Sequence, residues 1–135
     1  MRFPIVIHKE RKSDYGVIVP DLPGCFSAGT TLDEAIENAH EAIECHLEGL
    51  LLDGESIPKR QSLESLQKNS VYSGGTWVVV EVDISKLSGK VTRVNITLSE
   101  RVLAVIDEAA RREGESRSGL LALAALEYVE KHKAA

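Results

Sequence analysis

The chain has 135 residues, of which 43% are hydrophobic and 27% charged, a composition typical of a globular protein with room for one domain and a second, smaller one. No apolar run is long enough to cross a membrane, and the N-terminus opens into a strand pattern rather than a signal peptide, so we expect a cytoplasmic protein. Without a secretory context, Cys25 and Cys45 are expected to stay reduced.

The net charge of −5 comes from 16 basic and 21 acidic side chains, and the excess acid lies ahead of Gly89. A mildly basic tail after an acidic body suits a protein that holds nucleic acid with one end and a basic partner with the other. On charge alone, an ordinary solvated acidic surface is an equally good explanation.

The first half of the chain predicts a hairpin, a third strand and a long helix. Residues 3–8 and 15–19 alternate as two strands around a polar turn, and residues 25–28 follow a Pro-Gly break as a third strand. A helix is expected over residues 31–50, because Thr31 and Glu34 have the spacing of a capping box. Its apolar stripe predicts packing on one side of a sheet; the stripe comprises Leu32, Ala35, Ile36, Ala39, Ile43, Leu47 and Leu50.

After a polar stretch with a possible short helix near residues 62–68, residues 76–83 form the strongest strand signal in the chain. They begin apolar on both faces, as an interior strand does. The order β-β-β-α-β predicts a small α+β domain over residues 1–88, with residues 85–89 as the joint to a second domain, residues 89–135.

The second domain is predicted as a strand and two helices. Residues 93–98 alternate between Val94, Ile96 and Leu98 on one face and polar side chains on the other. Ser99 can cap a helix over residues 99–113, and Ser116 can cap another over residues 116–131, with Gly114 between them. The last helix is apolar around most of its circumference and is expected to be buried on several sides.

So small a unit needs a partner copy, a metal or disulfides to be stable, and only a partner copy fits the sequence. Through Arg93-Val-Asn-Ile-Thr-Leu and Glu115-Ser-Arg-Ser, the segment resembles the ribbon-helix-helix family of DNA-binding proteins. In that family two copies of the strand pair antiparallel and enter the major groove. The alternative is that the segment is an edge strand and a helical hairpin closing a larger core.

The ribbon-helix-helix resemblance assigns base reading to Arg93, Asn95 and Thr97. Arginine suits guanine O6 and N7, asparagine suits adenine N6 and N7, and the threonine methyl suits the thymine methyl. The resemblance also implies phosphate contacts from the start of the second helix, matching Ser116, Arg117 and Ser118, and a helix N-terminus favours anions. The basic residues of the tail barely outnumber its acids, so modest affinity per dimer is expected.

Residues 15–42 closely resemble the HicB antitoxin family, through Asp21-Leu-Pro-Gly-Cys, the Gly29-Thr-Thr turn and the Glu-Ala repeats of the following helix. With the tail, the resemblance covers nearly the whole chain. It implies a type II antitoxin whose N-terminal domain, similar to a reduced RNase H fold, covers a small mRNA-cleaving toxin called HicA. It further implies that the tail dimerises and represses the shared operon; whether dimers associate into tetramers stays open.

The sequence gives little support to the hypothesis that the protein is an enzyme, so we expect no catalysis, no cofactor and no metal. An RNase H-like nuclease needs several converging carboxylates, but Asp14 and Asp21 lie in loops. The acidic residues of the long helix are expected to form an ordinary solvated face; they are Glu37, Glu41, Glu44 and Glu48. His40, Cys45 and His46 resemble metal ligands, yet the last two point about 100° apart on a helix.

Two functions remain. The first is an antitoxin that binds a HicA-like toxin and operator DNA, with Asp14, Tyr15, Asp21 and Phe26, in or beside the Pro-Gly loop, as the candidate toxin contacts. The second is a stand-alone ribbon-helix-helix regulator whose N-terminal domain senses a small ligand. A neighbouring gene for a short basic protein would favour the first function.

Overall fold

The computed structural model describes residues 1–87 and 90–133. The chain forms two compact units, one of Arg2–Val82 and one that begins at Asp83 and includes Met1. Within the described residues, no helix combines the length and the apolar character needed to span a membrane.

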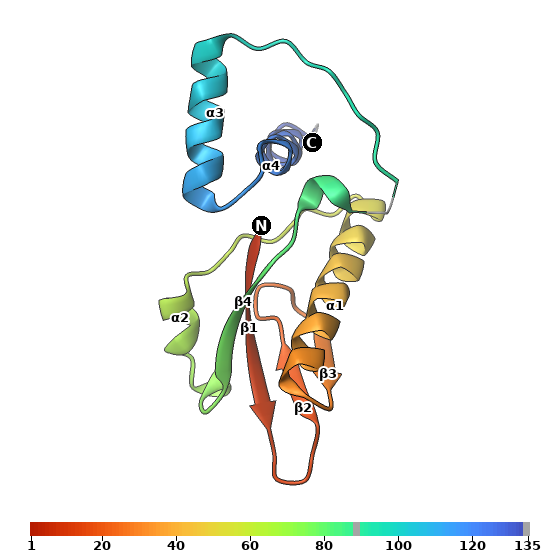
Figure 1. Cartoon of the computed structure of the whole chain (residues 1–135), viewed down its shortest axis with the longest axis vertical. Helices are drawn as coiled ribbons and strands as arrows, with labels where there is room; N and C mark the ends of the chain where they lie inside the picture. The colour runs from red at the N-terminus through yellow and green to blue at the C-terminus, as the bar shows by residue number, and fades with distance from the viewer. Residues whose placement is uncertain (88–89, 134–135) are drawn as a thin grey trace. The chain divides into compact units, whose positions relative to one another are not determined.

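The first unit is built on a four-stranded antiparallel sheet with the order β3-β2-β1-β4 (Figure 1). Its strands are β1 (Arg2–Lys9), β2 (Tyr15–Ile18), β3 (Phe26–Gly29) and β4 (Thr76–Glu81). The predicted hairpin and the β-β-β-α-β order are therefore confirmed. The register places Phe3, Ile5 and Ile7 on one face of β1 and Val6 on the other, and all four are buried.

The prediction that residues 76–83 form an interior strand is wrong, because β4 lies at the edge of the sheet and β1 lies inside it. The apolar character of β4 has another cause. Trp77 is half-buried and packs edge-on against Tyr72, with ring centroids 5.7 Å apart. Residues of the preceding loop therefore cover part of this strand, where a neighbouring strand was expected.

Helix α1 (Leu32–Leu52) packs on the sheet, where its buried side chains are Ala35, Ala39, Ile43 and Leu47. The buried stripe is narrower than predicted, because Leu32 is exposed and Ile36 and Leu50 are only half-buried. The Thr31 hydroxyl accepts a hydrogen bond from the Glu34 amide at 3.1 Å, as the capping box predicts. The return bond differs, since the Glu34 carboxylate accepts from the Thr30 amide at 3.3 Å.

The opposite face of the sheet carries an apolar row. Directly paired residues of the four strands form this row, which comprises Phe26, Ile18, Val6 and Trp77. Helix α2 (Leu63–Gln67), capped by Ser62, and the short 3-10 helix η1 (Ser70–Tyr72) belong to the loop that precedes β4. Helix α2 is the short helix expected near residues 62–68.

The second unit contains the 3-10 helix η2 (Ile84–Lys86) and two helices, α3 (Glu100–Glu113) and α4 (Arg117–Lys131). Ser99 and Ser116 cap the two helices as predicted, and Gly114 between them has the left-handed φ of 70°. The expected joint at residues 85–89 begins inside η2, and residues 88–89 lie outside the described residues.

Candidate functional sites

The segment expected to read DNA is extended but unpaired in the single chain. Within the described residues, 90–98 form no strand, so the strand predicted at residues 93–98 is absent from the monomer. A strand needs hydrogen bonds from a neighbour, and no strand among residues 1–87 and 90–133 pairs with this segment. Arg93, Asn95 and Thr97 are all exposed, as base-reading residues must be.

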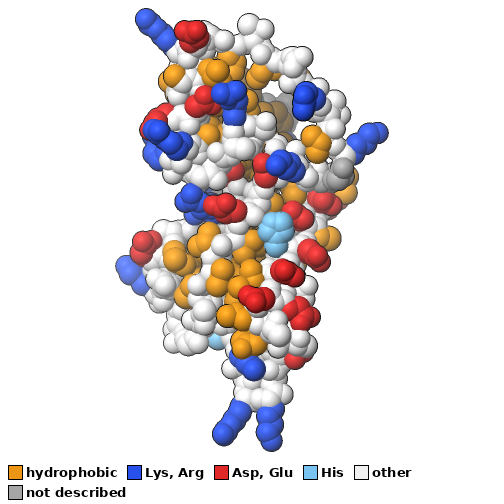
Figure 2. All heavy atoms as spheres, in the orientation of Figure 1, with side chains coloured by type: hydrophobic (Ala, Val, Ile, Leu, Met, Phe, Trp, Pro, Cys, Tyr) orange, Lys and Arg blue, Asp and Glu red, His pale blue; other side chains and the backbone are white. Residues whose placement is uncertain are grey.

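The apolar side chains of the same segment are exposed as well. Val94 is 73% exposed, Ile96 61% and Leu98 38%. Helices α3 and α4 add further exposed apolar residues, which are Val102, Val105, Leu126 and Val129. Figure 2 shows hydrophobic side chains at the surface beside the charged ones. Exposed apolar surface is typical of regions that bind another molecule.

The residues expected to contact phosphate lie together at the start of α4, and two of them already have partners. The Ser116 hydroxyl accepts from the Gly119 amide at 2.9 Å and donates to Asp83 at 3.1 Å. Arg117 donates two hydrogen bonds of 2.9 Å to the carboxylate of Asp107. These bonds lower the pKa of Asp107 and raise that of Arg117. Ser118 is exposed.

Asp83, which the sequence analysis did not single out, contacts the start of α4 through Ser116. Burial raises the pKa of its carboxyl group, but hydrogen bonds from Ser85 and Ser116, together with the nearby charge of Lys86, bring it below its ordinary value. In the sequence, the two-residue spacing of Asp83 and Ser85 indicates only a local turn. The contact with Ser116 spans 33 positions and has no sequence signal.

The four candidate toxin contacts occupy different environments and do not form one cluster. Asp14 is exposed in the β1–β2 turn, and Tyr15 at the start of β2 lies under the Lys9 ammonium, 4.7 Å from the ring centroid. Phe26 is 65% exposed at the start of β3. Tyr15 pairs with Gly29, whereas Phe26 pairs with Ile18, so the two aromatic residues lie at opposite ends of the β2–β3 pair.

Asp21 is buried, with 3% of its surface exposed. Its Oδ1 accepts from the backbone amide of Gln61 at 3.1 Å, and its Oδ2 has no hydrogen-bond partner in the part of the chain that the structure describes. Asp21 therefore fixes the loop around Gln61 to the Pro-Gly loop. This geometry suits a residue that positions neighbouring side chains.

An apolar cavity of about 300 Å³ opens beside Phe26. Its lining combines the Pro-Gly loop with Val71 and Tyr72, two residues that the sequence analysis did not single out. Val71 is exposed in spite of its apolar side chain. The buried thiol of Cys25 also lines the cavity. Burial raises the pKa of this thiol, as does the nearby Cys45, so the thiol stays neutral.

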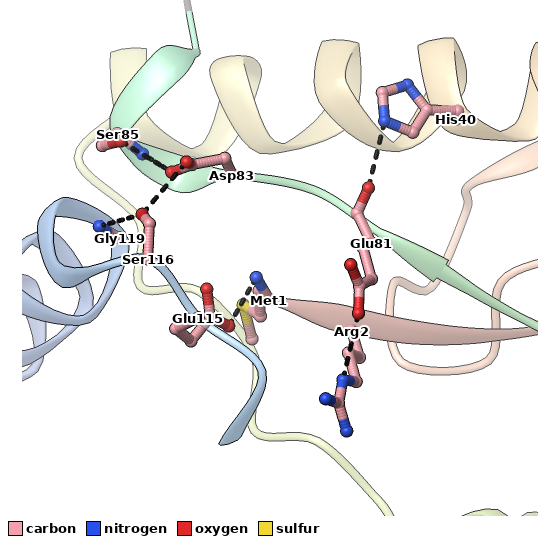
Figure 3. A network of polar contacts seen from close by, with 9 residues as sticks. All are labelled: Met1, Arg2, His40, Glu81, Asp83, Ser85, Glu115, Ser116 and Gly119. Atoms are coloured by element: carbon pink, nitrogen blue, oxygen red, sulfur yellow. Dashed lines mark hydrogen bonds and ion pairs between the residues drawn. The ribbon is translucent and has the colours of Figure 1, made fainter. Parts of the chain in front are cut away.

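No metal centre is present among the described residues, in which no three His, Cys, Asp or Glu side chains gather closely enough to hold an ion. His40 instead contacts the backbone oxygen of Glu81 at 3.1 Å (Figure 3) and the Glu44 carboxylate at 3.6 Å. Cys45 is exposed and Cys25 is buried, and both are free thiols.

Comparison with known proteins identifies the family. A sequence model of the HicB-like antitoxins of bacterial toxin-antitoxin systems matches residues 3–125. The chain belongs to the HicB-like antitoxin family. Antitoxins of this kind are generally not enzymes.

Individual relatives extend the likeness over nearly the whole chain. The crystal structure of the Burkholderia pseudomallei antitoxin HicB is 44% identical, covers 96% of this chain and 98% of its own, and has a TM-score of 0.76. An uncharacterised 14.9 kDa protein of Haemophilus phage HP1 is 44% identical over 123 residues, which are 90% of this chain and 92% of the phage protein.

A chain from the HicA3 and HicB3 toxin-antitoxin complex is 31% identical, covers 62% of this chain and 99% of its own, and has a TM-score of 0.53. The N-terminal domain of the Burkholderia HicB, solved separately, covers the same share of this chain, 62%, at 44% identity and a TM-score of 0.55.

Proposed function

We propose that this HicB-like protein inhibits a HicA-like, mRNA-cleaving toxin through its first unit and represses its own operon through a ribbon-helix-helix dimer formed by residues 89–135. The observation that carries the toxin half is family membership over residues 3–125, together with a relative that was solved in a toxin-antitoxin complex. The reduced RNase H fold implied by the resemblance remains part of this proposal.

The toxin surface of the proposal centres on the exposed Phe26, with Asp21 as a positioning residue. Asp14 and Tyr15, at the opposite end of the β2–β3 pair, are proposed as a separate contact. An exposed aromatic side chain beside an apolar cavity is typical of the residues that contribute most to protein-protein binding. The net charge of Arg2–Val82, with 7 basic and 13 acidic residues, suits a basic partner.

The DNA half rests on the exposure pattern of residues 93–98. In a ribbon-helix-helix dimer, the exposed Val94, Ile96 and Leu98 would face the interlocked helices of both copies, and the unpaired backbone would bond to the same segment of the partner copy. Arg93, Asn95 and Thr97 would then point away from that core toward base edges. Ser116, Arg117 and Ser118 would contact phosphate once Asp107 releases Arg117.

The proposal is tested with the full chain in two assays: growth of cells that express the toxin from the adjacent gene, and a mobility shift with the promoter duplex upstream of the pair. Replacing both Arg93 and Asn95 with Ala should abolish the shift and leave rescue intact, because base contacts specify the site and the first unit is unchanged. Phe26→Asp should do the opposite.

Val79→Asp is the matched control, because Val79 is an exposed apolar residue on the other edge strand. It should leave both assays unchanged. Operator affinity that survives the double alanine variant would overturn the DNA half. Rescue by Phe26→Asp at the wild-type level would overturn the toxin surface.

A further inference from the structure

The N-terminus of α4, which the proposed function assigns to DNA phosphate, already holds a carboxylate. The Ser116 hydroxyl donates to Oδ2 of Asp83 at 3.1 Å while it accepts from the Gly119 amide at 2.9 Å (Figure 3). Helix α4 has 15 residues, so its first turn carries the full positive end of the helix dipole. An aspartate therefore lies where a phosphate oxygen would be favoured.

Asp83 is held in this position from its other side. Its Oδ1 accepts two hydrogen bonds from Ser85, one from the amide at 3.0 Å and one from the hydroxyl at 2.6 Å. Both oxygens of the carboxylate are thus bound, and the group is ionised at neutral pH. Such charge-assisted bonds are stronger than those between neutral groups.

The space at the first turn of α4 is filled as well. A methyl group added at Gly119 would lie 3.2 Å from Oδ1 of Asp83 and 3.2 Å from Oε2 of Glu115. The Glu115 carboxylate is paired with the N-terminal ammonium of Met1, whereas the Asp83 carboxylate is bound to the Ser116 hydroxyl. A phosphate that takes the place beside this hydroxyl has to displace Asp83, because like charges in close contact repel. Arg117, which belongs to this turn, is bound to Asp107.

We propose that Asp83 is an internal substitute for DNA phosphate at the start of α4, so that operator binding has to displace its carboxylate. The inference rests on the proposed DNA-binding function and adds a regulatory contact to it. Operator affinity would then depend on the segment of Asp83 and Ser85, which touches no base.

The test compares full-length wild type with Asp83→Asn, which keeps the shape of the side chain and removes its charge. Two duplexes of equal length are used, the promoter duplex and one of unrelated sequence. Because phosphate contacts are independent of sequence, Asp83→Asn should bind both duplexes about three- to tenfold more tightly at low salt. The gain should shrink as salt rises.

Asp33→Asn is the control, because it removes the same charge from an exposed position in the first turn of α1. A second variant, Ser85→Ala, keeps the charge of Asp83 but removes the hydroxyl that holds it, and should give a smaller gain on both duplexes. Its thermal unfolding is measured beside that of wild type.

The outcomes separate the two claims. If wild type shifts the promoter duplex and Asp83→Asn binds no more tightly than Asp33→Asn, the proposal that Asp83 takes the place of a DNA phosphate is wrong. The DNA-binding function then stands. A gain on the promoter duplex alone would also overturn it, because that result indicates base reading. If neither wild type nor Asp83→Asn shifts any duplex at low salt, both claims fail.

Discussion

The two units of this chain bury their apolar residues to very different extents. In Arg2–Val82 a central strand and a helix enclose Phe3, Ile5, Ile43 and Leu47 completely. Among the described residues of the second unit, Ile84, Leu87 and Ala110 are the buried hydrophobic ones. The first unit therefore has a core of its own, whereas the second leaves most of its large apolar side chains exposed, as the proposed dimer would require.

The largest effect should come from emptying the core of the first unit. Phe3→Ala removes a fully buried ring from the central strand and should lower the free energy of unfolding by about 3–5 kcal/mol. Urea denaturation followed by tryptophan fluorescence measures this change, because Trp77 lies in the same unit. A loss below about 1 kcal/mol would mean that this core is not closed within the chain.

The second unit is tested with a charge placed in its proposed dimer interface, whereas the first is tested with a cavity in its core. Ile96→Asp places a carboxylate in the proposed dimer core, and should raise the dimer dissociation constant by at least about a hundredfold, because burying an unpaired charge is costly. Sedimentation equilibrium measures the constant, and the double Arg93→Ala, Asn95→Ala variant is the control from the same segment. Dimers of unchanged strength would place the interface elsewhere.

Two glycines of the first unit test how closely its helix meets its sheet. A Cβ at Gly29 would lie 2.4 Å from the backbone nitrogen of Ala35, so Gly29→Ala should destabilise the protein by about 1–3 kcal/mol. Gly49→Ala, within α1, meets nothing within 4 Å and should stabilise it by about 0.5–1 kcal/mol. Thermal unfolding compares the pair, and equal effects would contradict the close contact.

The smallest effect concerns the ion pair between Arg117 and Asp107. The hydrogen bond from Arg117 lowers the pKa of Asp107, so the pair stabilises the fold above the ordinary aspartate pKa of about 4 and is lost as the pH falls through the lowered value. The difference in helix content between wild type and Asp107→Asn, followed by circular dichroism, should therefore disappear in acid. A difference that persists at pH 2 would contradict this assignment.

Local signals made much of this fold predictable. The caps at Thr31, Ser99 and Ser116 and the left-handed Gly114 depend on a few neighbouring residues, and each occurs where the sequence indicates. The edge position of β4 was not predictable in this way, since strand order depends on pairing between distant segments.

The candidate sites show the same difference between features that depend on neighbouring residues and features that depend on distant contacts. The alternation at residues 93–98 is a local property and singles out Arg93, Asn95 and Thr97 as one polar set, although the apolar residues between them are exposed as well. The burial of Asp21 does not follow from local sequence, because an acid in a Pro-Gly loop is normally solvated, and its hydrogen-bond partner Gln61 lies 40 positions away in the sequence. The approach of Asp83 to Ser116 likewise depends on the tertiary structure.

In the proposed dimer, the exposed segment at residues 90–98 would also make the lifetime of the chain depend on its abundance. Exposed segments outside helices and strands are the preferred sites of proteolytic cleavage, and residues 90–98 are such a segment in the single chain. Pairing with a second copy would cover the same segment. A newly made antitoxin is then most easily degraded when it is scarce, and its half-life should lengthen as its concentration rises.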